Sequence, residues 1–152
     1  MKLETNQAIA NGRDLPISTK KSVDICKFIR GKSVDKARMR LQQVLDHKEA
    51  VPVKRHQQDV PHKPGPMAGG MYPENAIKKI LEIIDLAEKN AQHKGLNTKG
   101  LIIHNIRADL ASRSMRYGRQ GRRKVKRTHI EVIVQEASPA EKATPKKKET
   151  KQ

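Results

Sequence analysis

Apolar residues recur at intervals of three and four along three stretches of the chain, the spacing that places them on one face of an α-helix. Residues suited to helix ends flank each stretch. Ser18 and Ser33 can cap the first two at their N-termini, and Pro73 suits the first position of the third. Gly31 and Lys94-Gly95 are placed to end the first and the third. The pattern therefore predicts three helices, at about residues 19–30, 34–46 and 73–94.

Two later stretches, residues 101–106 and 128–134, are rich in β-branched and apolar side chains and favour β-strands. Residues 8–14 precede Leu15-Pro16 and suit an edge strand that ends at the proline. The two later strands follow one another as a hairpin, so we expect antiparallel pairing, with His104 facing His129 across the pair. Helices packed on one face of such a sheet give an α+β domain.

The segment at 51–70 and the end of the chain differ in composition from the rest. Residues 51–70 hold four prolines and three glycines among basic and histidine side chains. Because prolines at this density cannot continue a helix or a central strand, we expect an extended insertion without a core, either a flexible connector or a segment that orders on RNA. Residues 137–152 are Lys-rich and have little to bury, which predicts a disordered tail after a single domain of residues 1–136.

Positive charge dominates the chain, with 33 Lys and Arg against 16 Asp and Glu and a net charge of +17. Such a charge repels itself in the compact state and favours binding to a polyanion. Between Ser112 and Arg127 there are eight basic residues and no acid: Arg113, Arg116, Arg119, Arg122, Arg123, Lys124, Lys126 and Arg127. Guanidinium groups bind phosphate through two parallel hydrogen bonds. We therefore expect a cationic arm at about 107–127, tethered by a strand at each end, that binds nucleic acid.

A smaller basic set surrounds the junction of the first two helices. Its members are Lys20, Lys21, Arg30, Lys32, Lys36, Arg38 and Arg40. Arg30 and Lys32 flank the N-terminus of the second helix, a natural anion site, although an ordinary solvated helix face is the alternative for each residue. Only three aromatic residues occur, so the contact is expected to depend mainly on charge and shape, without aromatic base-stacking platforms.

Catalytic and metal-binding patterns are absent from the sequence. There is no glycine-rich phosphate loop ending in Lys-Ser/Thr and no Cys-x-x-Cys pair, and His56 and His62 lack further zinc ligands nearby. We predict no enzyme activity, cofactor or small-molecule substrate. The single Cys26 is expected to be a buried core residue in a reducing compartment. No apolar run approaches ~20 residues, so no membrane partner is predicted.

Four short stretches carry a family likeness, at residues 15–21 (LPISTKK), 28–34 (FIRGKSV), 87–91 (AEKNA) and 126–132 (KRTHIEV). In this order they resemble the universal large-subunit ribosomal protein family twenty-two, called L-twenty-two in bacteria and L-seventeen in eukaryotes. The likeness covers about residues 11–136. The proline-rich insertion, with Gly-Gly-Met-Tyr-Pro leading into the third helix, is similar to archaeal and eukaryotic members, and we expect an archaeal-type protein.

The resemblance implies three helices packed on a small three-stranded antiparallel sheet with a long basic β-hairpin arm. In that family the globular part binds large-subunit ribosomal RNA and the arm reaches the wall of the nascent-peptide exit tunnel. Partners implied are this RNA, neighbouring large-subunit proteins and the nascent polypeptide, all in the cytoplasm. By position, the RNA-binding residues are Lys20, Lys21, Arg30, Lys32, Arg107, Arg113, Arg116, Arg119, Arg122, Arg123, Lys124, Lys126 and Arg127. The tip comprises Met115, Arg116, Tyr117, Gly118, Arg119, Gln120, Gly121 and Arg122, in an arm shorter than is common in the family.

Two other classes of function share some of these features. A chromatin-like architectural protein would have the same charge, and its arm would enter a groove of duplex DNA. An RNA-processing nuclease would need a metal or acid–base cluster, which the sequence lacks. Competition between duplex DNA and ribosomal RNA distinguishes the first from the ribosomal interpretation.

Overall fold

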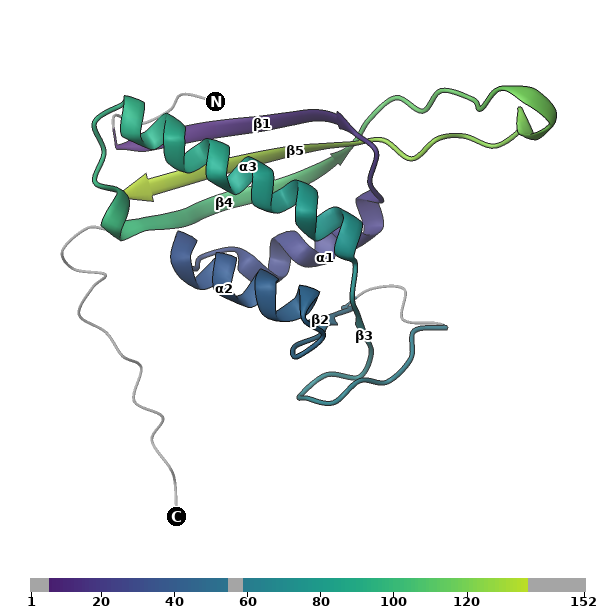
Figure 1. Cartoon of the computed structure of the whole chain (residues 1–152), viewed down its shortest axis with the longest axis horizontal. Coiled ribbons are helices and arrows are strands. Elements are labelled where there is room, and N and C mark those ends of the chain that lie inside the picture. The colour runs from purple at the N-terminus through teal and green to yellow at the C-terminus, as the bar shows by residue number, and fades with distance from the viewer. Residues whose placement is uncertain (1–5, 55–58, 137–152) are drawn as a thin grey trace, which may run out of the picture.

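The computed structural model describes residues 6–54 and 59–136 (Figure 1). Along the chain lie β1 (Gln7–Leu15), α1 (Thr19–Ile29), α2 (Val34–Leu45), β2 (Val51–Pro52), β3 (Gly70–Met71), α3 (Glu74–His93), β4 (Leu101–Leu110) and β5 (Thr128–Glu136). Strands β1, β5 and β4 form one antiparallel sheet with β5 in the centre, and β2 pairs with β3. The expected α+β fold, with three helices and a three-stranded antiparallel sheet, is confirmed.

The helices cover one face of the sheet and bury its apolar side chains. Helix α3 runs along β1 and β5, α1 packs against β4, and α2 packs against α3 (Figure 1). Aliphatic side chains fill the space between these layers, and the largest of them are fully buried: Ile25, Ile29, Leu41, Ile77, Ile80, Ile84, Ile103, Ile106 and Ile130. Cys26 is buried among them, as expected. Burial raises the pKa of this thiol to about 12, because the thiolate would lose its hydration.

Most of the predicted helix ends are confirmed. Ser33 precedes α2 with extended backbone and accepts a hydrogen bond from the Lys36 backbone N–H at 3.4 Å. Gly31 and Gly95 adopt the left-handed conformation after α1 and α3. Pro73, however, is the residue before α3 rather than its first residue. A single-residue shift of this kind is common at helix ends.

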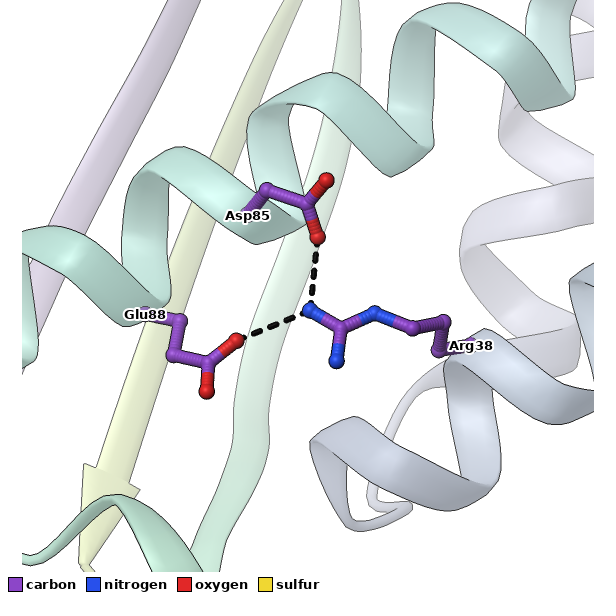
Figure 2. Close-up of polar contacts among 3 residues, drawn as sticks. All are labelled: Arg38, Asp85 and Glu88. Atoms are coloured by element: carbon purple, nitrogen blue, oxygen red, sulfur yellow. Dashed lines mark hydrogen bonds and ion pairs between the residues drawn. The ribbon is translucent and has the colours of Figure 1, made fainter.

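An ion pair joins α2 to α3 on the outside of the helical layer. One guanidinium nitrogen of Arg38, Nη2, lies 2.6 Å from Asp85 Oδ1 and 2.8 Å from Glu88 Oε2 (Figure 2). The two carboxylates are one turn apart on α3, so both can reach the same side chain of α2. The hydrogen bond to Glu88, and to a smaller extent the one to Asp85, raises the pKa of Arg38. The ion pair therefore links the two helices at a partly exposed position.

The segment at 51–70 departs from the expectation of an insertion without a core. Val51 and Val53 are buried, and Val51 joins the main apolar cluster. The paired strands β2 and β3 close the base of the insertion. Two valines flanking a proline explain the difference, because apolar side chains can be buried by a loop whose backbone is irregular. The tail predicted at 137–152 lies outside the described residues.

The expected pairing of His104 with His129 is wrong. A bulge falls at His104, where the register passes from Ile103 opposite Val134 to Asn105 opposite Ile133. His129 lies opposite Asp109, because β4 continues to Leu110 and pairs there with Thr128. The expected strand ended at residue 106 and therefore placed His104 too near the arm; the bulge itself displaces the later pairs by only one residue. Within the described parts of the chain, no helix is both long and apolar enough to span a bilayer.

Candidate nucleic-acid interface

The arm, residues 111–127, leaves the sheet between β4 and β5 and projects well beyond the helical layer (Figure 1). Backbone hydrogen bonds cross it at only three levels: Ala111 N to Arg127 O at 3.3 Å, Val125 N to Ser114 O at 2.9 Å, and Arg116 N to Arg123 O at 2.9 Å. The two sides of the arm therefore remain together without forming a regular ladder.

A tight turn forms the tip of the arm. Gly118 has a φ of +79°, which other residues rarely adopt, and its carbonyl accepts a hydrogen bond from Gly121 N at 2.9 Å. A Cβ at Gly121 would lie only 3.2 Å from the Arg116 carbonyl oxygen. Tyr117 is 99% exposed and Met115 is 58% exposed. The tip thus presents two large side chains outward on a backbone that requires its glycines.

The cations of the arm are available to a partner. Seven of the eight are exposed and Arg127 is half-buried. Within residues 6–54 and 59–136, none of the eight forms an ion pair with a carboxylate. By contrast, Arg38 and Arg40 on α2 are both paired with acids. A run of like charges that has no acidic partner among the described residues is repulsive in the free protein and favourable beside phosphates.

A hydrogen-bonded clamp holds the root of the arm to the start of α1. The Thr128 hydroxyl is fully buried and donates to the Ile17 carbonyl oxygen at 2.9 Å, so the Thr19 hydroxyl, 2.8 Å away, donates to it in turn. Arg127 Nη1 also donates to the Asp14 carbonyl oxygen at 2.9 Å. The clamp fixes the point at which the arm enters the sheet.

The smaller basic set is partly engaged within the fold. Lys20 and Lys21 are exposed on the first turn of α1. Arg30 Nη2 donates to the Ile106 carbonyl oxygen at 2.7 Å, which ties its side chain to β4. Lys32 is half-buried, and burial together with nearby Arg40 lowers its pKa. Lys20 and Lys21 are therefore freer to meet phosphate than Arg30 and Lys32.

Arg107 lies in β4 rather than in the irregular part of the arm. Its guanidinium is 2.9 Å from Glu131 Oε2 and 3.4 Å from Asp109 Oδ2. The hydrogen bond to Glu131 raises the pKa of Arg107. These acids compensate its charge, and the sequence could not show this because Glu131 is distant along the chain.

Sequence reasoning missed two features of this surface. One is the clamp at Thr128, whose partners are more than 100 residues away in the sequence. The other is an apolar groove beside Lys20 and Lys21 that reaches the root of the arm. Neither leaves a local signal in the sequence. Among the described residues, no group of three or more His, Cys, Asp or Glu side chains could hold a metal ion.

Comparison with known proteins agrees with this architecture. The family model of ribosomal protein L22p/L17e matches residues 10–135. Proteins named large ribosomal subunit protein uL22 are similar along most of their length: 38% identity to that of Methanococcus aeolicus, covering 89% of this chain and 95% of the relative, and 37% to that of Archaeoglobus fulgidus, covering 87% and 90%. The protein of Methanopyrus kandleri is 40% identical, covering 82% of this chain and 83% of its own. These relatives are archaeal, as the insertion predicted, and the chain belongs to the ribosomal protein L22p/L17e family.

Proposed function

We propose that this chain is a non-enzymatic, structural constituent of the large ribosomal subunit. Its α+β domain binds large-subunit ribosomal RNA, and its basic arm passes between RNA segments to the wall of the nascent-peptide exit tunnel. The observation that carries this proposal is the run of exposed cations at 113–126, free of acidic partners within the described chain and mounted on a sheet. The curated relatives, each named as a large-subunit protein, support the same role.

Each part of the molecule has a distinct task in this proposal. The clamp at Thr128 and the paired strands set the direction in which the arm leaves the domain. Arginine and lysine side chains neutralise phosphates where RNA helices pack closely, which lowers their mutual repulsion. Met115 and Tyr117, both exposed at the tip, are the large side chains that would face the tunnel lumen in this proposal.

A crosslinking experiment tests the position of the tip. A photoreactive amino acid replaces Met115, and the protein is assembled into ribosomes that carry a stalled, radiolabelled peptide. The matched control places the same group at Met39 on α2, which is similarly exposed at 56%. Crosslinks from position 115 to both RNA and peptide, with none to peptide from position 39, are the expected result.

Other outcomes would revise the proposal in defined ways. Crosslinks from position 115 to RNA alone would place the short arm inside the RNA and leave RNA packing as its role. Failure to enter the large subunit, together with preferential binding of duplex DNA in a competition assay, would favour an architectural DNA-binding protein.

A further inference from the structure

An apolar groove of about 390 Å³ lies where α1, the insertion and the root of the arm meet. Its floor is aliphatic, formed by Val23 of α1, Val53 and Val60 of the insertion, and Met71 of β3. Leu110, the last residue of β4, forms one wall and is 62% exposed. A leucine this exposed at the end of a strand gains little from the fold itself. The groove is therefore an open apolar surface built from three separate segments.

Cations surround this apolar floor. Lys20 and Lys21 line the groove from α1, and Arg113 lines it from the arm. All three are exposed, and none forms an ion pair within residues 6–54 and 59–136. An aliphatic slot with positive charge on two sides is complementary to a nucleotide, which has an apolar base face and a phosphate on either side.

The size of the groove also favours one nucleotide over a protein segment. Sites for single small molecules occupy ~300–1,000 Å³, and this groove lies near the lower limit of that range. A stable protein partner needs ~800 Å² of contact on each side, and its centre is usually depleted in charge. Three unpaired cations on the walls would oppose an apolar protein segment and favour an RNA strand.

We propose that this groove binds one unpaired nucleobase of the large-subunit RNA, turned out of its helix, while Lys20, Lys21 and Arg113 hold the flanking phosphates. The inference rests on the proposed RNA-binding function and adds a specific binding site to it. Aliphatic side chains can sandwich an extruded base as aromatic rings do. Asp24 also lines the groove, and a carboxylate can accept a bond from a base amino group in addition to any bond within the fold.

Binding at this site would add a second tie at the root of the arm. Leu110 ends β4 and Arg113 lies at the root of the arm, whereas Val23 and Lys20 belong to α1. A base held between them joins the two elements through the RNA. The bound RNA would then reinforce the direction that the clamp at Thr128 and the paired strands already give the arm.

The first test maps the occupant. A photoreactive benzophenone amino acid replaces Leu110 in the full chain, which is bound to transcribed large-subunit RNA, and primer extension locates the crosslinks. We expect a single crosslinked nucleotide that is unpaired in the RNA secondary structure. The same group at Leu86 of α3, another exposed leucine, is the matched control and should not crosslink to that nucleotide.

The second test measures energetic coupling between the groove and the base. An abasic site at the mapped nucleotide should weaken binding about tenfold, the contribution typical of one stacked base. Leu110→Ser should weaken binding similarly without changing the salt dependence, because no phosphate contact is lost. In the combination of both changes the losses should not add, which identifies a direct contact.

Four results would overturn the proposal. Crosslinks spread over paired nucleotides, or additive losses, would show that no base occupies the groove although the chain binds RNA normally. Crosslinking of position 110 to a protein in assembled subunits would identify a protein-docking groove instead. Absence of any binding to large-subunit RNA would refute the proposed function together with this site.

Discussion

Replacing Thr128 with valine tests whether the clamp at the root of the arm stabilises the domain. Valine keeps the β-branched shape of threonine, so strand geometry changes little, but the hydroxyl is lost. The Ile17 carbonyl oxygen then loses the hydrogen bond that Thr128 donates, and Ile17 is only 4% exposed. The Thr19 hydroxyl loses its acceptor. A buried polar group left without a partner costs about 1–3 kcal/mol. We expect a loss of this size in the free energy of unfolding.

Urea unfolding of the full chain, followed by far-ultraviolet circular dichroism, measures this loss. The midpoint should fall while the dependence on urea stays constant, because the surface exposed on unfolding is unchanged. Thr19→Val is the control: it removes only the outer bond, at a half-buried position, and should cost no more than about 1 kcal/mol. If Thr128→Val is no more destabilising than Thr19→Val, the clamp does not have the role assigned to it.

Three further predictions concern charge and ionisation. Arg116→Gln and Arg122→Gln should each weaken RNA binding and reduce the slope of log K against log salt concentration by ~0.7–0.9 per lost phosphate contact. The control Lys79→Gln, at a residue of α3 that is paired with an acid, should leave this slope unchanged. Equal slopes for all three variants would refute the phosphate contacts of the arm. The pKa of Cys26 is raised from 9.0 to about 12, so the stability contributed by the neutral thiol is present below pH 9 and is lost as the pH rises towards 12. Above pH 9 the free energy of unfolding should therefore fall more steeply with pH than in Cys26→Ala, by roughly 1.4 kcal/mol per pH unit. Parallel pH profiles of the two proteins would contradict this. Arg38→Gln should lower the free energy of unfolding by only ~0.2–1 kcal/mol, because the ion pair with Asp85 and Glu88 is partly exposed. Added salt should reduce this difference between variant and wild type in matched urea titrations. A loss above 2 kcal/mol would show that Arg38 has a larger role in packing.

Much of the fold could be predicted because its determinants are local. The cap at Ser33 and the left-handed glycine at 95 act within a few residues, and the apolar stripe of α3 repeats over many turns. The bulge at His104 could not be predicted, since it depends on how β4 fits β5 as a pair. The burial of Val53 escaped notice because the surrounding prolines dominate the local signal.

The candidate interface could be predicted only where charge accumulates in one stretch. The arm stands out because eight cations gather between Ser112 and Arg127 with no acid among them. Arg107 looked equivalent, but Glu131 on the neighbouring strand compensates it. The apolar groove combines α1, the insertion and the end of β4, so only the folded chain brings Val23, Val60 and Leu110 together.

The position of β5 at the centre of the sheet has a consequence for how the protein is made. Within the three-stranded sheet, β1 and β4 each pair with β5 alone, and β5 is the last of the described elements to be synthesised. Gln7 and Gln135, which face each other in the sheet, are 128 residues apart in the chain. The loop between them must close before the β1–β5 pairing yields any stabilisation, so this part of the sheet forms only after β5 has been made. A truncated chain would carry the cationic arm without the sheet that aims it, so only a finished chain acquires a correctly directed arm.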